Sequence, residues 1–306
     1  MPLIGWFKAA GPSGFGHNST AEQVTAGIDL RGRTVLITGV RGGIGLETLR
    51  VLGLRGAYII AAARSEAQAR KALDEASVQG TPVGFDLSEP DQVRAGVEQV
   101  RALGRLLDAV VCNAGIMALP TLHQKHGLEL QFLTNHLGHY LLITGLLDQL
   151  APRGRVVMVA SSAHRAAPRG GIQFDNLHGQ AGYGPWRNYG QSKLANILFA
   201  RALSRRLPQA GQTANALHPG VIRTDLARHM SPVIAMAMKV LRPIAFKTIA
   251  QGAATQCYAA VHPDVAEFNG AYFKDCAPAQ PTAAARDDAL AERLWAVSAE
   301  WAERLE

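Results

Sequence analysis

Short apolar runs that alternate with longer amphipathic segments are the feature that most constrains how this chain can fold. The apolar runs are RTVLIT (33–38), AYIIAA (57–62), PVGF (82–85), LLDAVVC (106–112), GRVVMVA (154–160), TANALH (213–218) and GAYF (270–273). Short apolar strands separated by helices are typical of a parallel sheet that is covered on both faces. Because such crossovers are right-handed, we expect a doubly wound α/β domain with ligands at the carboxyl ends of the strands.

Helices are expected in the segments between these runs. They are predicted from about Ile44, at 65–78, after an N-cap at Ser88, at 126–150 and around Tyr189. Before the first strand, STAEQV (19–24) has the pattern of a capping box, in which Ser19 and Glu22 open a short helix.

Composition and length favour a soluble globular protein. Hydrophobic residues make up 48% of the 306 residues and charged residues 18%, a balance that supports a sizeable core. No apolar run reaches the roughly 18 residues that a membrane span needs. The first residues are broken by Pro and Gly and lack the apolar core of a signal peptide. We therefore expect a cytoplasmic protein with a loose N-terminal arm and short capping helix (1–30) and one large domain (31–306).

The net charge of +7 suits an anionic partner, but the basic residues are scattered. Without a polybasic block or aromatic residues interleaved with basic ones, nucleic acid is disfavoured, whereas a phosphorylated small ligand fits. Cys112, Cys257 and Cys276 are interpreted as free thiols. The pairs His123/His126 and His136/His139 lack companion ligands, so we interpret them as structural and expect no metal.

The segment TGVRGGIG (38–45) lies between the first strand and the first helix. Gly39, Gly43 and Gly45 allow a tight turn and a close approach of a pyrophosphate to the backbone. The helix that follows, beginning near Ile44, offers unpaired N–H groups to the phosphates. This arrangement predicts a Rossmann-type dinucleotide site.

The end of the second strand indicates which dinucleotide fits. The run AAARS places Arg64 there, with no acidic residue before Glu66. Because an acid at this position selects a free ribose 2′-hydroxyl and an arginine selects a 2′-phosphate, NADP is predicted as the cofactor. Arg41, inside the glycine-rich loop, is a second candidate for the phosphate.

Tyr189 and Lys193 lie four residues apart in WRNYGQSKLAN (186–196) and would share one helix face. A nearby ammonium stabilises a phenolate, so we expect Lys193 to lower the pKa of Tyr189 towards the range useful for proton transfer. Tyr183 is the weaker candidate, because Pro185 interrupts a regular helix between it and Arg187.

In these residues the chain resembles the short-chain dehydrogenase/reductase family. TGVRGGIG, NAG (113–115), a Ser after the fifth strand, YGQSK and HPGVIRT (218–224) match the family motifs in order. NHLGHYLL, SSAH and YGQSKLANILF are most similar to its retinol-dehydrogenase branch and the bacterial relatives of that branch. The resemblance covers about residues 15–305.

The resemblance implies a set of catalytic and cofactor-binding residues. Asn135 would hold a water that leads to Lys193, Ser161 rather than Ser162 would hydrogen-bond the substrate oxygen, and Tyr189 would transfer the proton. Lys193 would also hold the nicotinamide ribose. The remaining implied contacts are Asp86 and Leu87 at the adenine, Asn113, Ala114 and Gly115 along the cofactor, and Pro219, Val221 and Thr224 at the carboxamide.

Together these features predict an NADP(H)-dependent oxidoreductase that interconverts a lipophilic ketone or aldehyde and its alcohol. The lipophilic substrate is inferred from 224–247, a Met-rich apolar segment expected to form a small helical lid, and 162–188 is expected to form a substrate loop. A carbon–carbon double-bond reductase, as in protochlorophyllide reductases, and a non-catalytic nucleotide-binding or scaffold protein are the alternatives. The resemblance leaves monomer and homodimer open.

Overall fold

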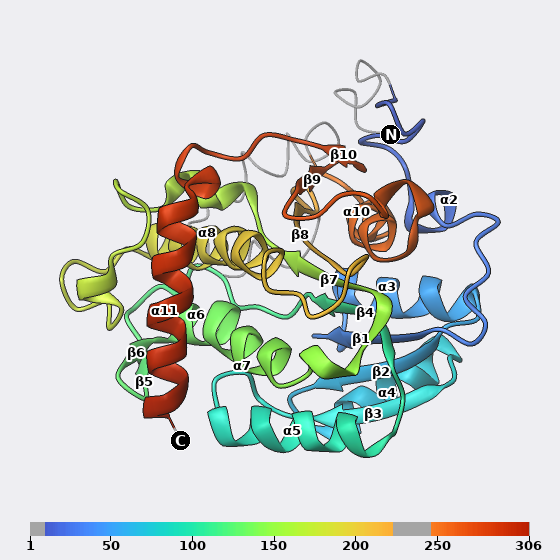
Figure 1. Ribbon diagram of the computed structural model, residues 1–306, viewed down its shortest axis with the longest axis horizontal. Coiled ribbons are helices and arrows are strands. Elements are labelled where there is room, and N and C mark those ends of the chain that lie inside the picture. Colours follow the sequence, from blue (N-terminus) through green and yellow to red (C-terminus); the bar gives the residue numbers. More distant parts are fainter. Residues whose placement is uncertain (1–9, 223–245, 306) are drawn as a thin grey trace.

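The computed structural model describes residues 10–222 and 246–305, and a single eight-stranded sheet forms its centre (Figure 1). The strands are β1 (Thr34–Thr38), β2 (Tyr58–Ala63), β3 (Gly80–Gly84), β4 (Leu107–Cys112), β7 (Leu150–Val159), β8 (Thr213–His218), β9 (Tyr272–Lys274) and β10 (Ala277–Pro278). Their order is β10-β9-β8-β7-β4-β1-β2-β3, and only the β9–β10 pair is antiparallel. Each predicted apolar run overlaps a strand, and the doubly wound α/β class is confirmed.

The chain reverses its direction of travel across the sheet between β1 and β4. From β1 it adds β2 and β3 on one side, and then it returns to add β4, β7 and β8 on the other. In open α/β sheets, ligands bind outside the carboxyl ends of the strands at such a switch point. The topology therefore places the expected ligand crevice beside the glycine-rich loop after β1.

Helices cover both faces of the sheet because alternate residues of each strand point to opposite sides. In β1, Val35 and Ile37 belong to one hydrophobic cluster and Leu36 to the other. The first cluster is covered by α2 (Ala21–Val24), α3 (Gly43–Leu54), α4 (Glu66–Ala76) and α10 (Ile249–Val261). The second is covered by α5 (Pro90–Ala102), α6 (Leu130–Phe132), α7 (Gly138–Thr144), α8 (Pro185–Leu203) and α11 (Asp288–Arg304).

Shorter elements lie in the connections. A small antiparallel pair is formed by β5 (Gln124–Lys125) and β6 (Leu128–Glu129). A π-helical turn, Leu133–Leu137, joins α6 to α7. Single 3₁₀ turns occur at Leu147–Gln149, Ser162–Ala166, Phe174–Asn176, Pro263–Val265 and Ala284–Arg286.

Two predicted N-caps are wrong by one residue. The capping box of α2 is made by Thr20 with Gln23, because the Ser19 hydroxyl instead accepts a hydrogen bond from the backbone N–H of Gly16. At α5, Pro90 occupies the first turn and makes Glu89 the N-cap residue. The Ser88 hydroxyl donates instead to Asp86 at 2.9 Å.

The predicted helix at 126–150 is divided into several elements. The β5–β6 pair occupies its start, where His126 has a positive φ of 52°. The Glu129 carboxylate then accepts hydrogen bonds from the N–H groups of Gln131 and Phe132 and opens α6. The π-helical turn follows, and α7 ends at Thr144. Sequence periodicity correctly indicated a helix here but missed both its late start and its π turn.

The described part of the N-terminal arm is packed rather than loose. The Phe15 ring lies edge-on to Tyr258 of α10, with centroids 6.0 Å apart, and the Ser13 hydroxyl donates to the Cys276 carbonyl at 2.9 Å. Residues 10–30 thus pack against the large domain. The domain boundary at residue 30 stays a prediction.

Thr224 lies outside the described residues, and so does the predicted lid (224–247) except for its last two residues. The structure describes nothing between 222 and 246. The two described flanks of the lid lie together: Ile222 and Lys247 form a parallel bridge. The Lys247 ammonium is 2.6 Å from Asp275 in the turn after β9 and is buried. Within the described ranges, no helix combines the length and apolarity that a bilayer crossing requires.

Candidate active site

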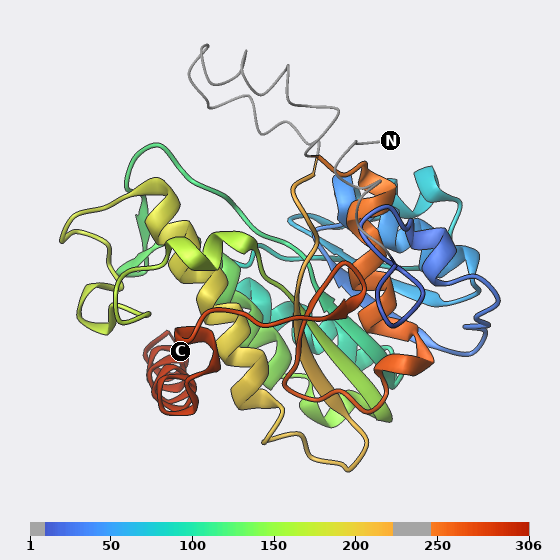
Figure 2. The same ribbon diagram turned by 90° about the horizontal axis from the view of Figure 1, so that it is seen from above.

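The carboxyl ends of β4, β7 and β8 and the first half of α8 converge at the predicted catalytic residues. Asn113 follows β4, Ser161 follows β7 and Pro219 follows β8, while Tyr189 and Lys193 lie on α8. Figure 2 shows α8 lying against one face of the sheet. The predicted helix around Tyr189 is confirmed: α8 begins at Pro185 after the N-cap residue Gly184. Tyr183 lies outside it, and its hydroxyl donates to the Leu119 carbonyl at 2.7 Å.

Ser161 and Tyr189 are brought together by a close approach of two backbones. A Cβ on Gly190 would lie 2.5 Å from the carbonyl oxygen of Ala163, so only glycine lets the 3₁₀ turn after Ser161 rest on α8 at this point. The proximity of the Ser161 hydroxyl lowers the pKa of the Tyr189 phenol. The choice of Ser161 over Ser162 as the catalytic serine stays a prediction.

The pKa of Tyr189 differs from the expected direction. Burial raises it to about 12, more than the nearby Ser161 hydroxyl lowers it. The Lys193 ammonium lies 5.8 Å from the centroid of the Tyr189 ring and donates to the Val159 carbonyl at 2.9 Å. Loss of solvent is therefore the dominant influence on the phenol. At neutral pH the phenol therefore carries its proton, as a proton donor must.

Lys193 is itself strongly affected by burial. Only 4% of its surface is exposed, and desolvation lowers the pKa of its ammonium to about 8. This group can therefore lose or regain a proton close to physiological pH. The same burial raises the pKa of the neighbouring Cys112 thiol, so Cys112 is an inert core residue.

The polar residues beside the Tyr–Lys pair tie α8 to its surroundings. The Asn135 side chain donates to Ser192 Oγ at 2.9 Å and exchanges two hydrogen bonds with the backbone of Ile116. The Ser192 hydroxyl donates to the Tyr189 carbonyl at 2.8 Å, and Asn196 donates to the Val159 carbonyl. Asn135 thus lies next to the pair, with its side chain fully used; the predicted water beside it stays a prediction.

The glycine-rich loop is packed directly against the NAG segment. Gly39 has a positive φ of 74°. A Cβ on Gly45 would come within 2.4 Å of the Gly39 carbonyl oxygen and 2.5 Å of Asn113 Nδ2, so a larger residue would separate the loop from β4. On the other side of Asn113, Gly115 faces Asn135 and Lys193: its Cβ would be 3.4 Å from Lys193 Nζ. A continuous path therefore connects the loop to the catalytic group.

Two observations test whether a dinucleotide fits this path. Helix α3 starts after Gly42 and has no side-chain cap, as is also the case for α5 and α8. Its first N–H groups are therefore free to bind phosphate. In addition, the buried Asn113 Oδ1 accepts no hydrogen bond from any described residue and can receive one from a ligand. The residues along this path therefore fit a dinucleotide. Gly43 and Ile44 lie at the start of α3, where the phosphates would bind.

Arg41 and Arg64 are exposed at the ends of two adjacent strands, β1 and β2. Neither guanidinium forms an ion pair or a hydrogen bond within the described ranges, although neighbouring arginines do: Arg70 pairs with Glu66, and Arg50 with Glu47 and Glu22. Two uncompensated guanidinium groups at this edge favour an anionic ligand.

The remaining predicted cofactor contacts are distributed around the same edge. Leu87 is buried, and the Asp86 carboxylate is occupied by Ser88, which binds it through both its N–H and its hydroxyl. Val221, after Pro219, has 45% of its surface exposed. Their contacts with a cofactor stay predictions.

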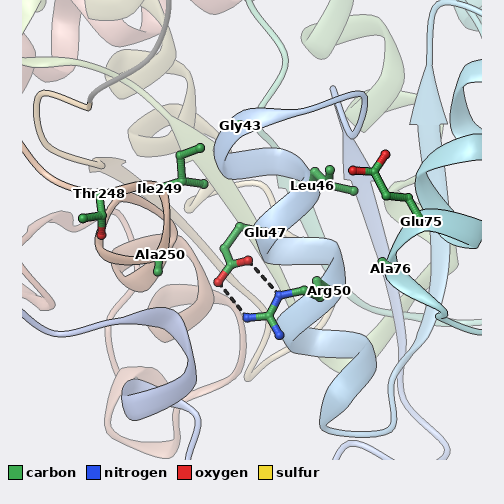
Figure 3. Close-up of a pocket in the computed structure, with 9 residues that line it drawn as sticks. All are labelled: Gly43, Leu46, Glu47, Arg50, Glu75, Ala76, Thr248, Ile249 and Ala250. Atoms are coloured by element: carbon green, nitrogen blue, oxygen red, sulfur yellow. Dashed lines mark hydrogen bonds and ion pairs between the residues drawn. The ribbon is translucent and has the colours of Figure 1, made fainter.

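A surface cleft of about 500 Å³ lies on the outer side of α3, between it and the start of α10 (Figure 3). It includes Gly43 but none of the predicted catalytic residues. Glu47, ion-paired with Arg50 at 2.8 Å, and Glu75 line it. Two carboxylates face one guanidinium there, that of Arg50, so the cleft offers no net positive charge to a phosphate.

Sequence reasoning missed two buried histidines at the site. His164 donates from Nδ1 to the Ser161 carbonyl at 2.7 Å and accepts at Nε2 from the Thr282 N–H. His218 accepts from the Ser162 N–H at 3.2 Å, and burial lowers its pKa to about 4. Their positions within SSAH and HPG were the available signal. Across the described residues, no group of His, Cys, Asp and Glu could hold a metal.

Comparison with known proteins identifies the family. The short chain dehydrogenase profile matches residues 33–233. Short-chain dehydrogenase TIC 32 A, chloroplastic, from Brassica napus is 42% identical, covering 97% of this chain and 97% of the relative. The chain therefore belongs to the short-chain dehydrogenase/reductase family, whose members are oxidoreductases that bind a nicotinamide cofactor.

Retinol dehydrogenase 12 from Mus musculus is 39% identical, covering 90% of this chain and 88% of the relative, which shows the retinol-dehydrogenase-like branch. A solved structure of an uncharacterised protein from Mycobacterium paratuberculosis superposes with a TM-score of 0.75 at 32% identity, covering 94% of this chain and 98% of that one. A Burkholderia cenocepacia short chain dehydrogenase in complex with NADP, at 24% identity and TM-score 0.63 over 79% of this chain and 96% of that one, shares the fold.

Proposed function

We propose that this protein is an NADP(H)-dependent oxidoreductase that interconverts a lipophilic ketone or aldehyde and its alcohol. The observation that carries the proposal is the placement of the buried Tyr189 phenol close to the Ser161 hydroxyl, with Lys193 and Gly115 beside it. When bound, the nicotinamide group supplies or accepts the hydride. Ser161 then orients the substrate oxygen, and Tyr189 gives it a proton from its Oη as negative charge develops there.

The identity of the cofactor follows from its charge. Arg64 and Arg41 are exposed and uncompensated where a dinucleotide's adenosine ribose would lie, and no carboxylate of the β2 end takes that position before Glu66. A 2′-phosphate would gain charge-assisted hydrogen bonds from these guanidinium groups. We therefore propose NADP rather than NAD.

A lipophilic substrate is supported by exposed apolar side chains beside Tyr189 and in two segments that carry predicted site residues. The Trp186 ring, 46% exposed, has its centroid 6.2 Å from that of Tyr189. Met117 follows the NAG segment and Val221 follows Pro219; these two are 36% and 45% exposed. Large apolar groups left exposed at a site favour a partner that covers them.

The proposal is tested by measuring NADPH and NADH oxidation with a panel of carbonyl compounds, followed by product analysis. We expect faster turnover with NADPH and with bulky apolar ketones or aldehydes, and alcohols as products. Saturated carbonyl products from enone substrates would instead indicate carbon–carbon double-bond reduction. Tight NADPH binding without turnover of any substrate would favour a non-catalytic nucleotide-binding protein.

We also propose that α11 prevents pairing of two subunits through α7 and α8. Trp295 stacks on Phe199 of α8, with centroids 5.7 Å apart, and Ser298 hydrogen-bonds His136 in the π turn. Asp288 pairs with Arg201 of α8 and with Arg205, just after the end of that helix. The protein is then a monomer, or a homodimer through another surface, and light scattering of the purified protein separates the two. The cytoplasmic location stays a prediction from the sequence.

A further inference from the structure

His139 of α7 connects the two halves of the candidate site. Its side chain is fully buried. Its Nε2 lies 3.0 Å from the hydroxyl of Thr38, the last residue of β1, and its Nδ1 lies 3.0 Å from the backbone carbonyl oxygen of Asn135. Thr38 belongs to the glycine-rich segment and Asn135 to the catalytic group, so one imidazole ring touches both.

The direction of each hydrogen bond follows from Thr38. Its oxygen accepts from the N–H groups of Asn113 and Ala114, both at 3.0 Å, and these use the two lone pairs of a hydroxyl. Its proton then goes to His139 Nε2 at 3.0 Å rather than to the Val111 carbonyl at 3.5 Å. Because Nε2 accepts, Nδ1 carries the ring proton and donates it to Asn135.

The surroundings keep this ring neutral. Burial lowers the pKa of His139 to about 4, and the positive charge of Lys193 acts in the same direction. A protonated ring would also face Thr38 with a donor at Nε2, where both lone pairs of the hydroxyl are already used. The neutral imidazole, with one donor and one acceptor, therefore fits both of its partners.

The Asn135 carbonyl lies inside the π-helical turn. Within Leu133–Leu137 the backbone bonds are displaced from the α-helical pattern: the Gly138 N–H bonds to the Leu133 carbonyl, five residues earlier. The His139 side chain supplies a donor to Asn135 inside this turn. A carbonyl oxygen has two lone pairs, so a second donor, such as the predicted water, can still bind.

We propose that His139 is a positioning residue that fixes the cofactor-binding segment Asn113–Gly115 and the Asn135 group relative to each other. Through Thr38 it supports the N–H groups at Asn113 and Ala114. Through the Asn135 carbonyl it supports a side chain that binds Ser192, the neighbour of Lys193. This inference rests on the proposed function, because it assigns the two ends of the ring to cofactor binding and to proton transfer.

The two ends can be separated by substitution. In His139→Gln the amide reaches the position of Nε2 and can accept from Thr38, but the donor to Asn135 is lost. In His139→Asn the amide reaches only the position of Nδ1, so the donor is kept and the link to Thr38 is lost. His139→Leu removes both. His136 is the matched control: it is equally buried, but its Nε2 contacts Ser298 of α11 at 2.8 Å.

Each variant is assayed for its NADPH dissociation constant by fluorescence, for kcat and KM on a carbonyl that the wild type reduces, and for its unfolding midpoint. We expect His139→Leu to weaken NADPH binding and to lower kcat, each about ten-fold. His139→Gln should restore affinity but not kcat, and His139→Asn should restore kcat but not affinity. The same three substitutions at His136 should lower the unfolding midpoint with both constants within about two-fold of wild type.

The inference is overturned if the His139 variants change affinity and kcat no more than the His136 variants do. It is also overturned if Gln and Asn restore the same constants equally. A wild type that reduces no carbonyl would refute the proposed function alone, because the NADPH affinities of His139→Gln and His139→Asn would still support or overturn the link through Thr38.

Discussion

Two cationic side chains at this site, Lys193 and Arg64, lie in opposite surroundings. Lys193 has 4% of its surface exposed, donates to the Val159 carbonyl at 2.9 Å, and has its pKa lowered to about 8 by burial. Arg64 is exposed at the end of β2 and has no ion-pair or hydrogen-bonding partner among the described residues. The Lys193 ammonium is thus bound by the protein itself, whereas the Arg64 guanidinium can bind a ligand.

This difference teaches how the site divides its work. A buried amine with a lowered pKa can take part in proton movement, and the fold must hold it in place because it has no solvent to stabilise its charge. An exposed guanidinium keeps its charge at all relevant pH values and discriminates ligands by their charge. We therefore expect substitutions near Lys193 to affect turnover and substitutions at Arg64 to affect the choice of cofactor.

The largest effect is expected at Tyr189, in the buried part of the site. Tyr189→Phe removes the proton donor and keeps the ring, so kcat should fall about 10³-fold while NADPH affinity stays within a few-fold. The measurement is steady-state kinetics together with NADPH titration. Tyr183→Phe is the control, because that phenol donates to the Leu119 backbone and lies outside α8; its kcat should fall less than about ten-fold. Turnover of Tyr189→Phe near that of the wild type would contradict the assignment.

The next largest effect is expected in the exposed part. Arg64→Gln removes a charge-assisted hydrogen bond worth about 1.5–3 kcal/mol, so KM for NADPH should rise roughly 10- to 100-fold with little change for NADH. Arg41→Gln should act in the same direction and more weakly. Arg70→Gln, whose side chain pairs with Glu66 at 3.4 Å, should change neither value. Equal effects of Arg64→Gln on both cofactors would show that the arginine does not read the phosphate.

A smaller effect is expected at Trp186, the exposed apolar residue closest to Tyr189. Trp186→Ala removes apolar surface that a bulky substrate would cover, so KM for such substrates should rise about five-fold, as the loss of about 1 kcal/mol implies. Small polar carbonyls should be unaffected. Leu106→Ala serves as the control, because Leu106 is 54% exposed just before the opposite, amino end of β4. An equal change in KM for bulky apolar and for small polar carbonyls would show that Trp186 does not contact the apolar part of the substrate.

The smallest effect is on stability. The pKa of Lys193 is about 8 in the folded protein against an ordinary 10.5, so between these values the unfolded chain binds more protons and stability rises with pH. Below pH 8 the full cost of burying the charge remains. Lys193→Met should therefore raise the unfolding midpoint by a few degrees at pH 7 and by less at pH 10.5. A midpoint that falls equally at both pH values would show that the Val159 hydrogen bond outweighs desolvation.

Much of the fold could be predicted from the sequence because it depends on local patterns. Apolar runs located the main strands, and Pro185 correctly separated Tyr183 from the helix of Tyr189. The failures come from interactions that these patterns do not encode. Ser19 and Ser88 have the right chemistry for caps, but competing partners, Gly16 and Asp86, engage their side chains. The π turn at Leu133–Leu137 has no signature in hydrophobic periodicity.

The candidate site shows the same limit. Residue spacing indicated Tyr189 and Lys193, and the family resemblance added Ser161 and Asn135. In the structure Ser161 and Lys193 lie near Tyr189, and Asn135 contacts Ser192 next to Lys193. The predicted direction of the Tyr189 pKa shift was wrong. Residue spacing shows that the phenol and the ammonium are near each other but not how deeply they are buried. His139 was interpreted as structural since its partners, Thr38 and Asn135, become neighbours only when β1 and α7 pack.

The most direct test of the central claim, that Tyr189 protonates a carbonyl oxygen as hydride reaches the carbonyl carbon, is an isotope-transfer experiment. NADPH carrying two deuterium atoms at C4 is incubated with the wild type and a bulky α,β-unsaturated ketone, and the product is examined by NMR. The account predicts one deuterium on the new carbinol carbon and none elsewhere. Deuterium on the former alkene carbon, or oxidation of the cofactor with no labelled product, would contradict it.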